Sequence, residues 1–348
     1  MRPWLSGLTL AILFLAFGAT PALGCAGLIG PNGAVNVTRT TTLAAYADGI
    51  EHYVTSFSFE GGGAAFGSLI PLPGVPTKVE RGGAWTLQRL IRETEPVKAF
   101  AVPGALTADA VRSPVDVLLT AKIDALDITV IRGGGAAVGE WARDKGFRLS
   151  PDAPEILDFY ADRSPIFLAA VFDGQAAAQR GQRVGDGTPV HLTIPVAQPW
   201  VPLRILTLGK APTDRVDADV YLLTGRRPAL LPGAPTRGLR VLTDQAASKA
   251  LLNDLRSDEG MSFIPTAAWL TKVRVDGAAS DIRFDLAIDP TGVATPSRVA
   301  AGLEAPSTPK APATPTAVDP DRIVPALMLL AGWLAVLALL RPWARRRA

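Results

Sequence analysis

One segment near the C-terminus constrains this chain more than any other feature, because residues 323–340 contain no charged side chain. At a rise of about 1.5 Å per residue, eighteen helical residues span roughly 27 Å, close to the roughly 30 Å hydrocarbon core of a bilayer. Arginines flank the segment on both sides: Arg322 before it, and Arg341, Arg345, Arg346 and Arg347 after it. Because basic residues favour the cytoplasmic side, we predict a transmembrane helix at 323–340 and a basic cytoplasmic tail at 341–348.

The first 24 residues have the pattern of a secretory signal peptide. Arg2 supplies the positive charge, residues 5–17 are uncharged and mostly apolar, and Ala22 and Gly24 are small residues at the expected cleavage site. As a helix, the apolar stretch spans only about 20 Å, which is short of a bilayer core and favours a cleaved signal peptide. An uncleaved membrane anchor is the alternative. Cys25 follows the cleavage site and is therefore a candidate for lipidation, with an ordinary thiol as the alternative.

Charge and cysteine content exclude several classes of protein. The chain has 35 Lys and Arg, 32 Asp and Glu, two His and one Cys. Eight of the basic and three of the acidic residues lie outside residues 25–291, which leaves this segment 27 basic and 29 acidic residues and a net charge of −2. We therefore expect no nucleic-acid partner. A single Cys excludes an intramolecular disulfide framework, and two His leave little material for a metal centre, so no cofactor is predicted.

Between the two ends we predict a folded domain followed by a stalk. Residues 292–322 form the predicted linker, because the stretch 305–316 consists mostly of Pro, Ala, Ser and Thr and favours extended, polyproline-like states. As a flexible coil the linker reaches roughly 30 Å, and as extended polyproline about 90 Å. Residues 25–291 form the predicted extracytoplasmic domain, which is long enough for a substantial core.

Hydrophobic patterning in the domain predicts an α+β fold with mixed, mainly antiparallel sheets and a few helices. Asp48-Gly49 is a hairpin signal between two strand-like runs. Asp244 is a plausible N-cap for the last helix, which has Leu251, Leu252 and Leu255 on one face. The predicted strands are 34–46, 50–59, 115–123, 126–131, 165–172, 190–195, 203–208, 220–223 and 282–288, and the predicted helices are 85–93, 136–145, 154–160 and 245–256.

Two similar halves, with a boundary near 150–185, are an open alternative for the domain. Strand-like runs end in prolines at 70–76 and again at 194–202, and proline cannot donate to a strand ladder. The glycine-rich stretches 61–67 and 133–139 also resemble each other. These repeats could reflect a duplication or chance in a chain with 33 Gly.

Four further stretches share their proline and aromatic positions with one bacterial family. They are TLAAYADGIE at 42–51, FGSLIPLP at 66–73, ITVI with WARDKGF at 128–131 and 141–147, and HLTIP with WVPLRI at 191–195 and 200–205. Together they resemble the exported proteins known as domain of unknown function 2330, over most of residues 25–225. The resemblance implies a signal peptide and often a C-terminal membrane segment, but no established activity and no catalytic residues.

His52 and His191 are the two candidates for hydrolytic chemistry. A Ser-His-Asp site needs a His, but no Gly-x-Ser-x-Gly elbow occurs, and a surface or hydrogen-bonded role is the alternative for each residue. Strand alternation places His52 on the face opposite Glu51 and Tyr53.

Other candidate patterns have a structural explanation beside the functional one. Gly133, Gly135 and Gly139 are spaced as in a dinucleotide-binding turn, but a strand-to-helix turn is favoured because nucleotides are scarce outside the membrane. The carboxylates of Asp214, Asp217 and Asp219, like the pair Asp124 and Asp127, could bind calcium, but they lack the EF-hand pattern and fit a strand with one wet face. Four tryptophans could bind sugars, but we expect at least three in the core: Trp85, Trp141, Trp200 and Trp269.

These observations predict a membrane-tethered, extracytoplasmic and non-enzymatic module. Its partners are the lipid bilayer and an envelope protein or glycan, and it would act by binding or by supporting an envelope assembly. The alternatives are an envelope hydrolase that uses His52 or His191, and an accessory subunit of a larger membrane complex. No catalytic, cofactor-binding or metal-binding residue is assigned, and Cys25 is the one candidate modification site.

Overall fold

A computed structural model describes residues 27–30, 33–35, 40–58, 66–95, 117–181 and 187–306 of the chain. The signal peptide, Cys25 and the membrane segment predicted above lie outside these residues. Within the described part, no helix has the length and apolarity needed to cross a membrane. The described residues up to Ala305 form one unit.

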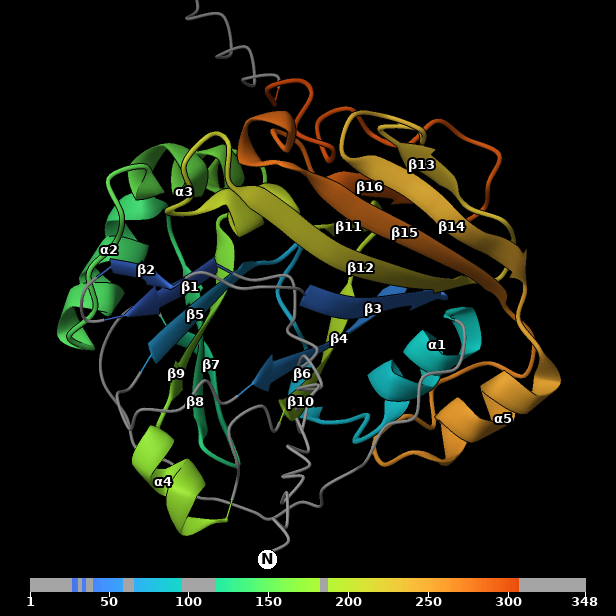
Figure 1. Ribbon diagram of the computed structural model, residues 1–348, viewed down its shortest axis with the longest axis horizontal. Coiled ribbons are helices and arrows are strands. Elements are labelled where there is room, and N and C mark those ends of the chain that lie inside the picture. Colours follow the sequence, from blue (N-terminus) through green and yellow to red (C-terminus); the bar gives the residue numbers. More distant parts are fainter. Residues whose placement is uncertain are drawn as a thin grey trace, which may run out of the picture. The chain divides into compact units, whose positions relative to one another are not determined.

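The largest sheet has seven strands and joins segments from both halves of the chain (Figure 1). The predicted hairpin at Asp48-Gly49 is present, and both residues adopt the positive φ angles, 52° and 78°, that a tight hairpin turn requires. β3 and β12 pair in parallel, and the other neighbours are antiparallel. The order across the sheet is β14 (Leu239–Ala246), β15 (Trp269–Ala278), β12 (Arg215–Thr224), β3 (Thr40–Ala47), β4 (Ile50–Ser58), β10 (Gly187–Pro195) and β6 (Lys78–Arg81).

A second sheet of six strands is entirely antiparallel, and a third, small sheet has three short strands. The six-stranded order is β2 (Gly33–Val35), β1 (Gly27–Gly30), β5 (Phe66–Pro71), β9 (Ile166–Phe172), β8 (Leu126–Arg132) and β7 (Val117–Ile123). The small sheet consists of β11 (Trp200–Val201), β16 (Leu286–Asp289) and β13 (Ala229–Leu231).

Helices pack in two pairs against the sheets. α1 (Thr86–Thr94) and α5 (Lys249–Ser257) contact each other on the seven-stranded sheet, and α2 (Gly135–Asp144) contacts α3 (Ala153–Ala161) at the other side of the unit (Figure 1). The remaining helices are short: α4 (Gly174–Gln179) and the 3₁₀ helices η1 (Arg204–Thr207) and η2 (Ala279–Asp281).

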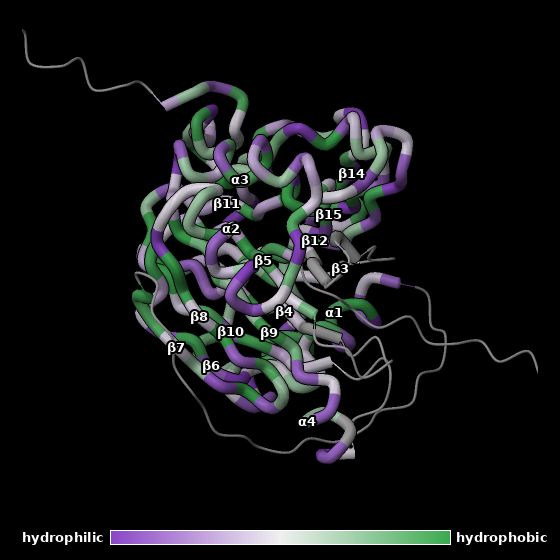
Figure 2. Tube along the Cα trace, turned by 90° about the vertical axis from the view of Figure 1, so that its left-hand side faces the viewer, coloured by the Kyte–Doolittle hydropathy of each residue, from purple (hydrophilic) through white to green (hydrophobic). Residues whose placement is uncertain are grey.

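Two apolar clusters form the core, one on each face of the seven-stranded sheet. The larger cluster fills the space between the sheets, and Ala44 of β3 belongs to it. Leu43 and Ala45, which point to the opposite face, belong to the smaller cluster under α1 and α5, together with Leu251 and Leu255. Figure 2 shows hydrophobic positions, in green, along the strands. Each fully buried leucine stabilises the fold by about 1.5–3 kcal/mol.

The prediction of an α+β fold with mainly antiparallel sheets and few helices is confirmed. Two local predictions are wrong. The predicted strand at 203–208 is instead the 3₁₀ helix η1, because the Asp285 carboxylate accepts hydrogen bonds from the backbone N–H groups of Leu203, just before η1, and of Arg204. Asp244 is not a helix cap, because β14 continues to Ala246 and Ser248 caps α5 by accepting from Leu251 N at 3.1 Å.

The chain does not separate in space near residues 150–185. Strands β3, β4 and β6 precede this region, β10, β12, β14 and β15 follow it, and all seven share one sheet. Of the two glycine-rich stretches, Phe66 and Gly67 begin a strand, whereas Gly135–Gly139 begins a helix.

Residues 292–305, which the composition assigned to the linker, pack onto the folded unit. Ala300 and Ala301 are buried, and the Ala301 carbonyl accepts a hydrogen bond from Asp285 N at 3.0 Å. The Ala300 carbonyl accepts from the Arg163 guanidinium at 2.6 Å. The fold therefore extends to Ala305.

Candidate functional site

The two histidines of the chain, 139 residues apart in sequence, contact each other. The pairing of β4 with β10 places His52 beside Thr193 and His191 beside Val54, so the two rings lie diagonally on one face of the sheet. Nδ1 of His52 lies 2.9 Å from Nε2 of His191, which is a hydrogen bond in which one neutral ring donates to the other.

Burial keeps both histidines neutral. The His191 side chain is only 2% exposed, and its desolvation, together with the repulsion it would meet from a protonated His52, lowers the pKa of His191 to about 4. Desolvation also lowers the pKa of the half-buried His52. Phe263 stacks on both rings, with centroids 3.9 Å from His52 and 4.5 Å from His191.

The carboxylate of Glu80 lies next to the two histidines, but no nucleophile contacts them among the described residues. Glu80 of β6 places Oε1 3.3 Å from His191 Nδ1, out of line for a good hydrogen bond, and its Oε2 pairs with Lys78 at 2.6 Å. In the described part of the chain, no hydroxyl or thiol hydrogen-bonds to either imidazole. The cluster can therefore exchange protons, while the hydroxyl needed for a Ser-His-Asp site does not contact it.

Glu51 lies on the opposite face of β4, as alternation predicts. It is fully buried in the larger apolar cluster, and neither carboxylate oxygen has a hydrogen-bond partner among the described residues. Desolvation raises the pKa of Glu51 to about 8, so the side chain is mostly protonated at neutral pH.

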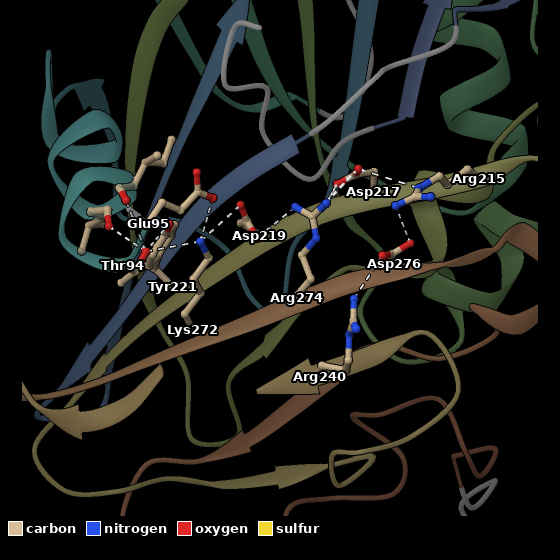
Figure 3. Close-up of polar contacts among 12 residues, drawn as sticks. Thr94, Glu95, Arg215, Asp217, Asp219, Tyr221, Arg240, Lys272, Arg274 and Asp276 are labelled. Atoms are coloured by element: carbon tan, nitrogen blue, oxygen red, sulfur yellow. Dashed lines mark hydrogen bonds and ion pairs between the residues drawn. The ribbon is translucent and has the colours of Figure 1, made fainter. Parts of the chain in front are cut away.

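The predicted calcium ligands Asp217 and Asp219 belong to a row of alternating charges across β12 and β15 (Figure 3). Arg274 lies between them, 2.8 Å from Asp217 and 3.2 Å from Asp219. Lys272, only 1% exposed, lies 3.7 Å from Asp219 and 3.0 Å from Glu95. Cations from the neighbouring strand therefore neutralise both carboxylates.

The row continues outward to the exposed side of the sheet, where Asp276 pairs with Arg215 at 2.8 Å and with Arg240 at 3.2 Å (Figure 3). Asp214 is not in this row and accepts instead from Ala211 N. Asp124 pairs with Arg81, and Asp127 with Lys122. Among the described residues, no group of three or more His, Cys, Asp or Glu side chains is suited to a metal ion.

The glycine turn before α2 connects a strand to a helix. The Asp158 carboxylate occupies the place at the helix N-terminus where a bound anion would lie. Gly133 has φ +146°, where a Cβ would lie 2.5 Å from that of Ala137. The Gly135 N–H donates to Asp158 Oδ1 of α3 at 3.2 Å. A phosphate at this N-terminus would meet the negative charge of Asp158.

A cavity of about 480 Å³ lies between α2 and α3 beside this turn. Its lining includes Gly135, Gly139, Arg143, Leu149, Pro154 and Asp158. The spacing of the glycines was visible in the sequence, but this cavity was not, because its walls come from two helices and the loop between them.

The tryptophans divide evenly. Trp141 and Trp200 are 3% exposed and belong to the core, whereas Trp85 and Trp269 are half-buried. The Trp269 indole N–H donates to Asp244 at 2.6 Å. The structure thus places two of the four in the core, fewer than predicted.

A buried ion pair that no sequence pattern predicted joins Arg163 and Asp285. Their side chains are 3% and 0% exposed and lie 2.5 Å apart. Tyr160 also donates to Asp285, at 2.8 Å, and stacks on Trp200. No local pattern could have revealed this pair, because 122 residues separate the partners.

Comparisons with known proteins show the family and little more. No curated protein matches the chain. Two solved structures, one of baculovirus P35 and one of a mutated baculovirus P35 after caspase cleavage, share 11% and 8% identity with the chain, each with a TM-score of 0.34. They cover 61% and 72% of this chain and 76% and 99% of their own.

A family model matches residues 19–232, the region in which the proline and aromatic landmarks lie. The chain therefore belongs to the bacterial family described as "uncharacterized protein conserved in bacteria", domain of unknown function 2330.

Proposed function

We propose that the protein is a binding module held outside the cytoplasmic membrane by one C-terminal transmembrane helix. The support comes from the signal-peptide pattern of residues 1–24, the uncharged segment 323–340 and the arginines that follow it. The Pro-rich stretch after Ala305 would hold the folded unit away from the lipid, within reach of envelope components.

The contact between His52 and His191 carries the preference for binding over catalysis. A general base must lie within about 2.6–3.2 Å of the group whose proton it takes. Here the two imidazoles meet each other at 2.9 Å, and Phe263 stacks over both. The cluster joins β4, β10 and the segment after α5, which is a structural use of both rings.

The proposed partner is an envelope glycan or protein. Residues 25–291 have a net charge of −2, which does not favour polyanions. An accessory role in a larger membrane complex is one form that such protein binding could take.

The membrane part of the proposal is tested on the intact chain. We expect the protein to stay with vesicles after carbonate extraction, and a reporter fused after Ala348 to lie in the cytoplasm. Release by carbonate, or an outward-facing reporter, would contradict the tether.

The binding part is tested with residues 25–305, screened against envelope glycans and envelope proteins and against chromogenic ester, amide and glycoside substrates. We expect saturable binding without turnover. The hydrolase alternative rests on the Glu80–His191–His52 arrangement, so it requires turnover that disappears in His52→Gln and His191→Gln variants. Such turnover would replace the binding proposal.

A further inference from the structure

The cavity between α2 and α3 has an apolar floor and few side chains on one wall. Leu149 and Pro154 line it from the loop and from α3, over the fully buried Leu157. Ser150 also lines it, and its hydroxyl has no hydrogen-bond partner among the described residues. A volume of about 480 Å³ falls within the range of small-molecule sites.

Gly139 opens this cavity at a cost to the helix that carries it. Glycine in a helix interior is less stable than alanine. Packing does not require it here, because the nearest atom to a Cβ at this position would be Leu149 Cδ1, at an ordinary contact distance of 3.8 Å. Its structural effect is to leave the α2 wall bare.

Opposite charges lie toward the two ends of the cavity. Gly135, Gly139 and Arg143 follow at intervals of four residues and therefore share one side of α2. At one end, Asp158 Oδ1 accepts from Gly135 N, and the carboxylate has a second oxygen to offer. At the other end, Arg143 is exposed and has no ion-pair partner in the described part of the chain.

We propose that this cavity binds a short peptide with free termini. Residues 135 and 143 are about 12 Å apart along the helix axis. An extended tripeptide spans about 10 Å, which brings its ammonium group to Asp158 and its carboxylate to Arg143. Its apolar side chains lie on Leu149 and Pro154. This inference rests on the proposed binding function and gives it a ligand class.

The test uses the full chain in nanodiscs, titrated calorimetrically with the tripeptide Ala-Leu-Ala. We expect one saturable site, and binding at least about tenfold weaker for the same tripeptide with an acetylated N-terminus and amidated C-terminus, because charge-assisted hydrogen bonds are lost. Arg143→Gln and Asp158→Asn should each weaken binding of the free tripeptide by about tenfold; Asn keeps the acceptor for Gly135 N.

The variant Gly139→Leu distinguishes a loss of the cavity from a loss of folding. It should abolish binding by filling the cavity, without lowering the melting temperature, because it replaces a helical glycine. Arg148→Gln is the matched control: Arg148 is also exposed but does not line the cavity, and its loss should leave binding unchanged.

Absence of binding at millimolar tripeptide, or binding that survives Gly139→Leu, overturns this inference and leaves the tethered binding module standing. Mass spectrometry of the titrated peptide separates the two proposals. Cleaved peptide would overturn the non-enzymatic function, while loss of cleavage in Gly139→Leu would still locate the peptide in this cavity.

Discussion

At the scale of single residues, β4 places two ionisable neighbours in different surroundings. Glu51 points into the apolar core between the sheets, and His52 points to the face covered by Phe263. Burial favours the neutral form of both groups, so it raises the pKa of Glu51 and lowers the pKa of His52 and of its partner His191. Their effects on stability therefore have opposite pH dependence.

The histidine pair should destabilise the fold in acid. Below about pH 6.5 the unfolded chain binds protons that the folded His191, with a pKa of about 4, does not, so the free energy of unfolding falls between pH 6.5 and 4. We expect His191→Gln to remove about 2–3 kcal/mol of this decrease, measured by urea unfolding across that range. An unchanged slope would show that His191 is protonated in the folded state.

Glu51 should destabilise the fold at alkaline pH. Its folded pKa of about 8 exceeds the unfolded value of 4.5, so its contribution to stability is lost progressively as pH rises from 4.5 to 8. We expect Glu51→Met to raise the free energy of unfolding by about 1–3 kcal/mol at pH 8 and by less at pH 5. A less stable variant at pH 8 would mean that the carboxyl has a partner in solution.

At the scale of elements, the charge row across β12, β15 and β14 has a buried and an exposed end (Figure 3). Removing one partner of a buried pair leaves an uncompensated charge and costs about 3–5 kcal/mol, whereas exposed pairs contribute about 0–1 kcal/mol. Lys272→Met should therefore lower the free energy of unfolding by about 2–4 kcal/mol, because Arg274 still faces Asp219.

Arg240→Gln is the matched control at the exposed end of the same row. It should lower the free energy of unfolding by less than about 1 kcal/mol. Both variants are measured by guanidinium-induced unfolding. Equal losses for Lys272→Met and Arg240→Gln would contradict the gradient of burial along the row.

At the scale of the whole molecule, the last residues of the fold can be tested by truncation. Chains 25–305 and 25–291 differ by the segment whose Ala300 and Ala301 carbonyls accept from Arg163 and Asp285 N. We expect 25–305 to melt cooperatively and 25–291 to melt at least about 5 °C lower or to aggregate, because the Arg163–Asp285 pair becomes exposed. Equal melting temperatures for the two chains would show that residues 292–305 do not stabilise the fold and belong to the linker.

Local pattern predicted the elements better than their arrangement. The helices at Thr86–Thr94 and Ala153–Ala161 and the hairpin at Asp48-Gly49 follow from periodicity and turn chemistry, which act over a few residues. η1 was missed because side chains distant in sequence, Asp285 and Tyr160, bind its backbone. Strand 269–278 was missed because Lys272 and Arg274 make a buried strand look polar.

The same limit applies to the candidate sites. The sequence identified His52, His191 and the glycines of α2, but not which of them lie together. Sheet register decides that His52 meets His191, and it depends on pairing between strands more than a hundred residues apart. The cavity wall formed by α3 has the same origin, since helix packing is not encoded by any one segment.

The way the folded unit ends also has a mechanical consequence. A pull on the tether proposed here would act on Glu304, which pairs with Arg298, and on Leu303, whose N–H donates to the Arg298 carbonyl. It would then reach the carbonyls of Ala300 and Ala301, which accept from Arg163 and from Asp285 N. The Asp285 side chain accepts from Tyr160 and from the backbone N–H groups of Leu203 and Arg204, so tension would spread into the interior instead of peeling a strand from a sheet edge. A tether of the kind proposed here would thus join the folded unit next to a buried ion pair, Arg163–Asp285.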